Sequence, residues 1–334
     1  MLEWIINVLR RFGNRHTITP EAVAWAYRLF LDREAENRQV IDDKVKRFTT
    51  TRELRNEFFH ADEFLQKNPG LHSPTLSGFE PRMSIEEMIS QPEQVALFMH
   101  IQETWQRLGE TEPYWSVLTA DQFRQTHIQN GKEAFYNSGQ ADVDRILKTL
   151  DRNGIDSAFL KSCLEYGCGL GRVTRWLANK FETVVACDIS QPHLKIAHSY
   201  LADEGISNTS LIHIRHVDDI FSLPRVDLIY SVIVLQHNPP PLIALIIKQF
   251  VTSLNPGGVA LFQVPTYRVG YQFSLKQYLN AEAKEQAMEM HVFPQRKVFE
   301  IVKQEGGNVI EVQEDGWTGS RHQEVSNTFL VQKE

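Results

Sequence analysis

The sequence has few cysteines, no long apolar run and no strong excess of one charge. Its three cysteines, Cys163, Cys168 and Cys187, have neither the number nor the spacing of a disulfide framework or a zinc site. No segment approaches the roughly 20 apolar residues of a membrane-spanning helix, and the N-terminus lacks the residue order of a signal peptide. These absences predict a cytoplasmic protein.

Charge and composition narrow the class of protein further. The net charge is -7, which argues against a general nucleic-acid-binding protein. Apolar residues make up 42% of the chain and charged residues 23%, as in ordinary globular proteins, which excludes a disordered or collagen-like chain. The 334 residues have room for one large domain and a smaller one.

Residues 1–110 are predicted to be helical. The opening segment, 1–16, is amphipathic and carries three arginines, so it either packs on its own domain or contacts an anionic membrane surface or an assembly complex. Thr50 and Glu53 have the spacing of a capping box at a helix start. Turn-forming residues over about 68–84 predict a linker between this helical region and the rest of the chain.

One N-terminal segment, WAYRLFLDREAENRQVIDDKVKRFTTTRELRNEFFHADEFL, resembles a small helical module of unknown function. That module reads YRLLLGREPD and ends near F-x-x-S-x-E-F, and it recurs in bacterial surface and polysaccharide-associated proteins. This chain has Asp32, Ala35 and Ala61 where the module has glycine, proline and serine. The alternative is a generic helical hairpin.

Helices and strands then alternate along the chain. Ser84 with Glu87, and then Pro92, are predicted to begin two helices, and a helical lead-in covers 111–160. Five apolar strands follow and alternate with amphipathic helices, which predicts an α/β fold whose parallel sheet has helices on both faces. Two further strands are close enough to pair antiparallel. The predicted strands cover residues 162–166, 183–187, 210–215, 227–234, 258–263, 309–312 and 328–331.

The central motif runs from Cys163 to Ser190: a strand, the turn EYGCGLG, a helix, and a second strand ending in Asp188. A dinucleotide-binding G-x-G-x-x-G turn would need a third glycine at Arg172 or Thr174, depending on its start, and both positions lack it. The remaining pattern, E-x-G-x-G-x-G followed by an acidic strand end, resembles the first two motifs of the class I S-adenosylmethionine-dependent methyltransferases.

Two later stretches, VDLIYSVIVLQHNPPP and LNPGGVALFQVP, extend this resemblance in the family's order. The resemblance covers roughly 150–334, so a methyltransferase domain is predicted over 111–334. It implies a Rossmann-like, doubly wound, mostly parallel seven-stranded sheet with an antiparallel last strand, in addition to the N-terminal all-α region. It also implies S-adenosylmethionine as cofactor, S-adenosylhomocysteine as product, and no metal.

The resemblance implies a set of cofactor-binding residues. The glycines let the backbone approach the methionine portion of the cofactor, and Glu165 would hold its ammonium group. Asp188 would accept hydrogen bonds from both ribose hydroxyls, and Asp218 or, by its spacing from Pro224, Asp219 would meet the adenine. Arg172 is either a ligand contact or a surface charge. The complete predicted set is Glu165, Gly167, Gly169, Gly171, Asp188, Ile189, Asp218, Asp219, Ser231 and Val232.

The sequence gives fewer signals for the residues that bind the methyl acceptor. His237 follows the fourth strand and either acts as general base or shapes the loop, and His291 is a second candidate base. The insertion 265–292 is predicted to be a substrate lid. Within it, the rings of Tyr267 and Tyr271 could pack on a sugar, and Arg268 could pair with a phosphate. The alternative is that the aromatic residues form the hydrophobic core of the insertion itself.

The residues of these stretches, such as QHNPPP, are most similar to those of bacterial methyltransferases associated with surface polysaccharides. This similarity predicts O-methylation of a sugar, nucleotide-sugar or lipid-linked glycan acceptor. Methylation of another small molecule, a non-catalytic scaffold that keeps the fold, and a nicotinamide-dependent oxidoreductase are the alternatives. Trp115, Phe135 and Tyr136, ahead of the first strand, either cover the cofactor or pack in the core.

Overall fold

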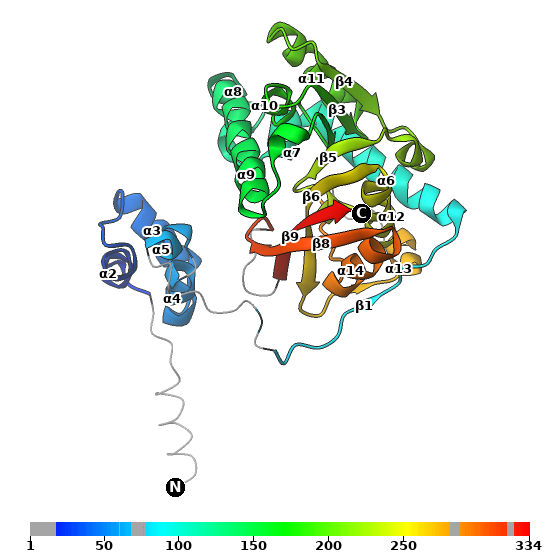
Figure 1. The fold of residues 1–334 in the computed structure, drawn as a ribbon. Coiled ribbons are helices and arrows are strands. Elements are labelled where there is room, and N and C mark those ends of the chain that lie inside the picture. Colours follow the sequence, from blue (N-terminus) through cyan, green and yellow to red (C-terminus); the bar gives the residue numbers. More distant parts are fainter. Residues whose placement is uncertain (1–17, 60, 68–75, 77, 281–287, 319–323) are drawn as a thin grey trace. The chain divides into compact units, whose positions relative to one another are not determined.

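The computed structural model divides the chain into two compact units, Met1–Pro74 and Thr75–Glu334 (Figure 1). The division falls inside the predicted linker. The amphipathic segment 1–16 lies outside the described part of the chain, and no helix within that part is long and apolar enough to cross a membrane. The structure describes residues 18–59, 61–67, 76, 78–280, 288–318 and 324–334.

The smaller unit consists of short helices around an aromatic core. The predicted capping box is confirmed, because Thr50 Oγ1 accepts from the Glu53 amide at 3.2 Å and Glu53 Oε2 accepts from the Thr50 amide at 3.1 Å. The core includes Val23, Tyr27, Leu54 and Phe58. The helices are α2 (Pro20–Leu31), α3 (Arg38–Arg47), α4 (Thr51–Phe59) and α5 (Asp62–Lys67).

Two features of this unit fall on the residues that resemble the helical module. Asp32 ends α2 with a left-handed φ of 50° at the position where the module has glycine, the residue that adopts this conformation most easily. The Arg33 guanidinium donates to both carboxylate oxygens of Glu63, at 2.9 and 3.0 Å. This ion pair joins the turn after α2 to α5, both within the matched segment.

In the described part of the larger unit, seven strands form one sheet in the order β4-β3-β2-β5-β6-β9-β8. β9 runs antiparallel to both of its neighbours, and the other pairs are parallel. The predicted Rossmann-like fold with an antiparallel last strand is confirmed. The strands are β2 (Ser162–Tyr166), β3 (Thr183–Asp188), β4 (Thr209–His213), β5 (Val226–Ser231), β6 (Leu254–Arg268), β8 (Gly307–Asp315) and β9 (Glu324–Lys333).

The strands after β2 differ from their predicted bounds by one to five residues at one or both ends, and two of these differences have a visible cause. β5 ends at Ser231 instead of residue 234, because Ile233 has a φ of 59°, which a strand cannot accommodate. β6 extends from residue 254 to 268 instead of 258 to 263, since β9 pairs with it as far as Arg268.

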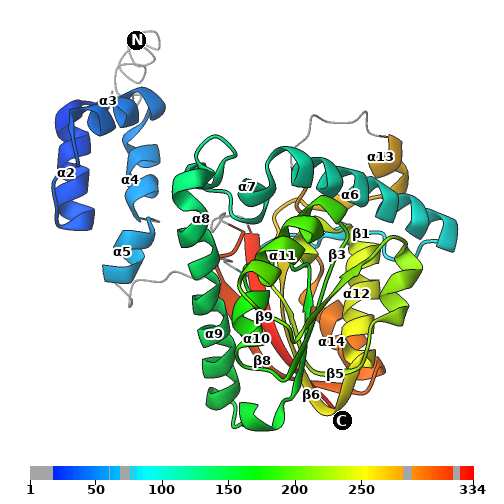
Figure 2. The same cartoon turned by 90° about the horizontal axis from the view of Figure 1, so that it is seen from above.

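Helices cover both faces of the sheet (Figure 2). On one face, α9 (Gly139–Arg152) and α10 (Thr174–Ala178) pack over β2, β3 and β5. On the other, the cluster of buried side chains is larger and includes the three helices α6 (Gln91–Thr111), α12 (Pro240–Thr252) and α14 (Gln295–Gln304).

The sequence grouped α6 with the N-terminal helices, whereas in the structure it belongs to the sheet unit. The reason is that Leu97, Phe98 and Ile101 of α6 are buried in the core on the second face of the sheet. The remaining helices of this unit are α7 (Pro113–Val117), α8 (Ile128–Asn137), α11 (Gln191–Asp203) and α13 (Leu275–Asn280).

The prediction that a helix begins at Ser84 is wrong. Ser84–Ile85 forms the short strand β1, which pairs in parallel with β7 (Gln272–Phe273). Glu87 does not cap a helix but pairs with Lys297 at 3.1 Å. The capping box stands at Ser90 and Glu93, at the start of α6, where Pro92 occupies the first turn as predicted.

Candidate functional site

The glycine turn after β2 adopts a backbone that only glycine fits. Gly167 and Gly169 have φ values of 79° and 52°. A Cβ on Gly167 would lie 2.4 Å from Val234 Cγ2, and one on Gly169 would lie 2.9 Å from Val117 Cγ2. The turn therefore packs directly against the loop after β5 and against α7.

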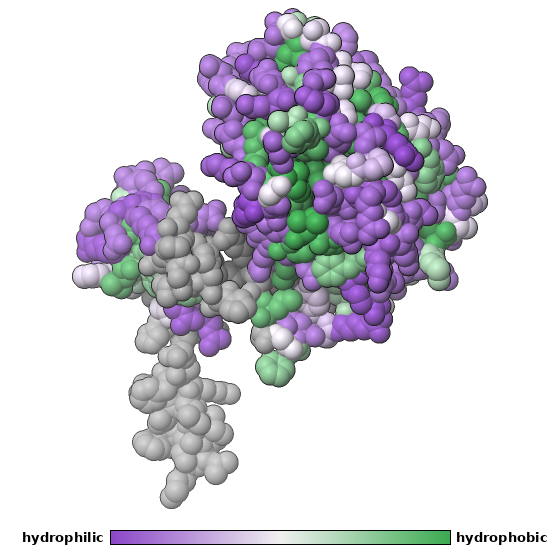
Figure 3. Space-filling model, in the orientation of Figure 1, coloured by the Kyte–Doolittle hydropathy of each residue, from purple (hydrophilic) through white to green (hydrophobic). Residues whose placement is uncertain are grey.

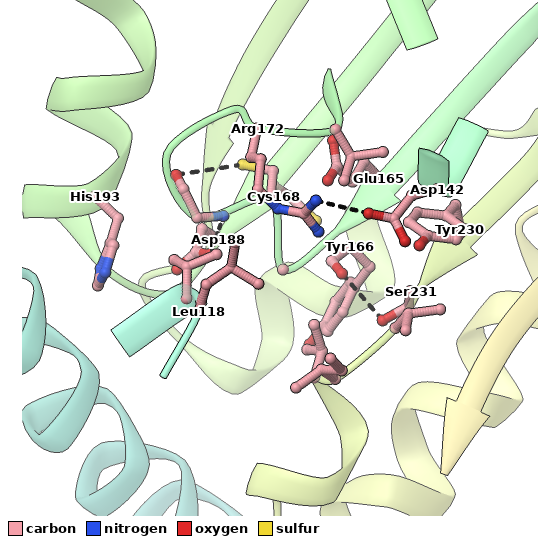
Figure 4. Close-up of a pocket in the computed structure, with 18 of the residues that line it drawn as sticks. Leu118, Asp142, Glu165, Tyr166, Cys168, Arg172, Asp188, His193, Tyr230 and Ser231 are labelled. Atoms are coloured by element: carbon pink, nitrogen blue, oxygen red, sulfur yellow. Dashed lines mark hydrogen bonds and ion pairs between the residues drawn. The ribbon is translucent and has the colours of Figure 1, made fainter. Parts of the chain in front are cut away.

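A cavity of about 290 Å³ lies over this turn, at the carboxyl ends of β2, β3 and β5 (Figure 4). On the surface in Figure 3, apolar side chains gather in a band between polar regions on this face of the larger unit. Most of the predicted cofactor residues lie where the sequence put them. Those in the cavity lining are Glu165, Gly167, Gly169, Asp188, Ile189, Ser231 and Val232, whereas Gly171 only shapes the turn.

Glu165 is a buried carboxyl group in the cavity wall. It is 4% exposed, and Thr174 Oγ1 donates to its Oε2 at 2.5 Å. Burial raises its pKa to about 8, because a charged carboxylate loses its hydration there. A cationic ligand group would stabilise the charged form, so Glu165 fits an ammonium group.

Asp188, at the end of β3, links the glycine turn to the next helix. Its Oδ2 accepts from the Gly169 amide and its Oδ1 from the Ser190 amide, each at 2.8 Å. Each carboxylate oxygen keeps a further lone pair. Both oxygens can therefore accept from neighbouring hydroxyls, as on a ribose, while they hold the turn.

A charged cluster at the cavity includes residues that the sequence did not identify. Asp142 on α9 accepts from Arg172 at 2.6 Å (Figure 4). It also accepts from Arg145 at 2.9 Å. The Arg145 guanidinium lies 4.6 Å from the ring centroid of Trp317, and all four residues line the cavity. Arg172 is thus a half-buried member of an ion pair at the cavity. Asp142, Arg145 and Trp317 lie outside the recognised motifs, which explains why they were missed.

His193, on α11, was also missed. Its Nδ1 lies 2.6 Å from Ser190 Oγ and its Nε2 2.9 Å from Ser116 Oγ. Burial lowers its pKa, so the ring is neutral at pH 7. Trp105, from α6, also lines the cavity. The serine three residues before His193 is the only local sequence signal for this contact.

The two candidate adenine acids lie elsewhere. Asp219 caps the short 3-10 helix Val217–Ser222, where its Oδ2 accepts from the amides of Arg215 and His216 at 2.7 and 3.0 Å. Asp218 is exposed and is not among the described residues that line the cavity. The structure thus gives Asp219 a capping role.

His237 is not part of the described cavity lining. Its Nδ1 donates to the Glu289 carbonyl at 2.8 Å, and its Nε2 accepts from the Gln236 side-chain amide at 3.3 Å. Burial lowers its pKa to about 4. With both ring nitrogens bonded to protein groups, the geometry favours the loop-shaping role over the general base.

His291 lies within the insertion instead of at the cavity. Its Nδ1 is 2.8 Å from the Tyr271 hydroxyl, and its Nε2 is 3.3 Å from Glu289 Oε2. Tyr278 also donates to Glu289. This polar cluster, together with buried Phe273, supports the alternative that these side chains form the insertion's own core.

The other predicted substrate residues also hold the insertion in place. Tyr267 donates to the Pro81 carbonyl at 2.6 Å. Arg268 donates to Glu324 at 2.8 Å and to the Met290 carbonyl at 3.0 Å. Neither residue belongs to the described cavity lining. Of the predicted lid 265–292, residues 281–287 lie outside the described part of the chain.

Trp115, Phe135 and Tyr136, which precede β2 in the sequence, pack within the protein and do not line the described cavity. Phe135 and Tyr136 are fully buried in a core with Tyr114, and Trp115 lies under the Arg124 guanidinium at 4.5 Å. The cavity instead receives Ser116, Val117 and Leu118 from this part of the chain. The described residues contain no group of histidine, cysteine or acidic side chains suited to a metal ion.

Cys168 and Cys187 border the same cavity as buried side chains. Burial raises the pKa of both thiols. They are therefore protonated at neutral pH and serve as small packing residues.

Residues 163–258 match a family model described as a methyltransferase domain. Magnesium protoporphyrin IX methyltransferase from Synechocystis PCC 6803, solved with bound S-adenosylhomocysteine, is similar over 71% of this chain and 99% of its own, with 15% identity and a TM-score of 0.50. An S-adenosylmethionine-dependent methyltransferase from Clostridium acetobutylicum is similar over 62% of this chain and 97% of its own, with 18% identity and a TM-score of 0.45. No curated protein matches the sequence. At such identities the structural similarity speaks for the fold alone.

Proposed function

We propose that this chain, an S-adenosylmethionine-dependent methyltransferase, transfers the methyl group to an oxygen of a sugar or glycan-related acceptor. The matched methyltransferase domain and the completeness of the donor end of the cavity support the first half of this proposal. The acceptor class rests on Trp317 and Arg145, which also line the cavity, and on the resemblance to polysaccharide-associated methyltransferases.

The donor end fits the cofactor by the chemistry of its residues. Glu165 suits the ammonium group, and Asp188 suits the two ribose hydroxyls. The glycines of the turn have no side chains, so the backbone fits where an added Cβ would collide with neighbouring side chains. When bound, the cofactor supplies an electrophilic methyl group and its own leaving group. The chain therefore has to align the acceptor and exclude water from the reacting atoms.

The observation that carries the acceptor class is Trp317 at the cavity with Arg145 4.6 Å from its ring centroid. An indole face packs well against the apolar face of a sugar ring. The Arg145 side chain is 47% exposed, so it can also meet a phosphate or carboxylate on the acceptor. In this proposal these two residues replace Tyr267, Arg268 and Tyr271 as the acceptor contacts.

The histidines take a supporting part in the proposed reaction. His237 and His291 hold the insertion to the loop after β5 through Glu289. Methyl transfer from a sulfonium group depends chiefly on alignment, so we assign neither ring the acceptor proton.

Calorimetric titration with S-adenosylmethionine and S-adenosylhomocysteine tests the donor half. The folded protein should bind both, and binding of neither would overturn the proposal. Incubation with methyl-labelled cofactor and a panel of sugars, nucleotide-sugars and lipid-linked glycans tests the acceptor half. Label in a porphyrin or amine control panel and in no sugar would place the acceptor in another class.

The N-terminal unit and the site of action belong to the same proposal. Because its segment resembles a module of polysaccharide-associated proteins, we propose that this unit holds the enzyme at a polysaccharide assembly site on the cytoplasmic side of the membrane. Sedimentation of the full chain with anionic vesicles checks the membrane contact.

A further inference from the structure

Ile233, in the loop after β5, has an unusual backbone conformation. Its φ of 59° lies in the left-handed region, which β-branched side chains rarely adopt. Ile233 also lines the cavity. Such conformations persist where surrounding contacts impose them, and they concentrate at functional sites.

The Ile233 backbone amide is bonded to Gln263 on β6. Gln263 is 0% exposed, and its Oε1 accepts from the Ile233 amide at 3.0 Å. Its Nε2 donates to Ser326 Oγ at 2.7 Å and to Gln236 Oε1 at 3.1 Å. Every polar atom of this buried side chain is therefore bonded, which fixes its orientation.

The consequence of the Ile233 conformation lies one residue further along the chain. Val234 packs so closely on the glycine turn that a Cβ on Gly167 would lie 2.4 Å from its Cγ2. Val234 and Gly167 both line the cavity. The left-handed turn at Ile233 thus brings the loop onto the donor-binding turn.

We propose that Gln263 is a positioning residue, which holds Ile233 in the left-handed conformation and so sets the wall that residues 232–234 form beside the methyl donor. This inference rests on the proposed function, since it places the donor in this cavity. Gln263 acts through the loop backbone and does not touch the donor itself.

A mutant cycle scored by S-adenosylhomocysteine affinity tests the inference. Gln263→Leu should weaken binding by about tenfold or more, the loss expected when a buried amide loses its partner. In an Ile233→Gly background the same substitution should cost less than about threefold, because glycine keeps a positive φ without support. Ser326→Ala, which leaves the Ile233 bond intact, serves as the matched control and should stay within about threefold.

Two results would overturn the inference. An equal loss in both backgrounds would reduce Gln263 to a packing residue, and no loss in either would remove its role altogether. Binding of neither cofactor form by the wild-type chain would instead overturn the proposed function. If Gln263→Leu does not fold, Gln263→Asn makes the same comparison, because its shorter side chain does not reach the Ile233 amide.

Discussion

Two groups of cavity-lining residues, here called the donor end and the acceptor end after the ligand that we assign to each, differ in where they come from in the sequence. The donor end is built largely from one continuous stretch, Cys163–Ser190, which supplies Glu165, the glycine turn and Asp188. The acceptor end combines Asp142 and Arg145 on α9 with Trp317 in the segment after β8. Local sequence therefore encodes the donor site, whereas the acceptor end exists only after the chain has folded.

The two ends also differ in charge. The donor end presents carboxyl groups, of which Glu165 is neutral at pH 7 because its pKa is raised to about 8. At the acceptor end, beside Glu165, one carboxylate, Asp142, pairs with Arg145 and with Arg172 of the donor stretch, which leaves a net positive charge on these three groups. The first arrangement suits a cationic ligand group, and the second suits neutral polar or anionic groups.

The largest effect is expected from Asp188→Ala. This substitution leaves the Gly169 and Ser190 amides without their charged acceptor and removes the acceptor for the ribose hydroxyls. Affinity for S-adenosylmethionine should fall by about 100-fold or more, measured by calorimetry.

Asp218→Ala is the matched control for this prediction. Asp218 is an exposed acid that the sequence also assigned to the cofactor but that the structure places outside the described cavity lining. Its removal should change affinity by less than about twofold. Equal losses in the two variants would break the assignment of the donor end.

The second effect is a pH dependence that arises at Glu165. Its folded pKa of about 8 lies above the ordinary 4.5, so its contribution to stability is lost as pH rises between these values. The cofactor ammonium pairs with the carboxylate form, so binding at pH 7 should release a proton. Affinity should rise about tenfold per pH unit from pH 6 to pH 7.5, measured by calorimetry. Titrations in buffers of different ionisation enthalpy measure the released proton.

Glu165→Gln serves as the control for the pH effect. The amide cannot ionise, so the variant should bind more weakly and without this pH dependence. A wild-type affinity that is flat over the same pH range would contradict the role of Glu165 as ammonium ligand.

The fold and much of the donor end could be predicted from the sequence. The order of strands and helices follows from apolar periodicity, so the fold was predicted correctly. The glycine turn with its two acids is a contiguous pattern, and the structure brings most of the predicted donor residues to one cavity. Asp219, which the spacing from Pro224 assigned to the adenine, caps a 3-10 helix in the structure and is not among the described residues that line the cavity. Sequence spacing alone does not separate a cap from a ligand.

The acceptor end could not be predicted for a physical reason. Arg268 and Tyr267 have the chemistry of sugar contacts, but their partners, Glu324 and Pro81, are distant in sequence and turn them into structural ties. Trp317, in the segment after β8, meets Arg145 of α9 at the cavity only in the folded chain. Chemistry of this kind depends on tertiary contacts.

The third prediction tests the acceptor end directly. Trp317→Ala removes the indole face beside Arg145 and should lower kcat/KM for the acceptor found in the labelled-cofactor panel by about tenfold. Affinity for S-adenosylhomocysteine should stay within about twofold. Trp25→Ala, which replaces an exposed tryptophan of the N-terminal unit, is the control and should leave kcat/KM unchanged. A loss confined to cofactor affinity would move Trp317 to the donor end.

The smallest effect is expected from His237→Ala. A general base contributes about 100-fold or more to the rate, whereas a residue that holds a loop costs less when its neighbours keep their own contacts. Gln236 remains bonded to Gln263, and Glu289 to Tyr278 and His291. Turnover should therefore fall by only about threefold between pH 6 and pH 8, with an unchanged pH profile. A fall of about 100-fold, with a new pH dependence absent from His127→Ala, would restore His237 as the base and bring it into the acceptor end.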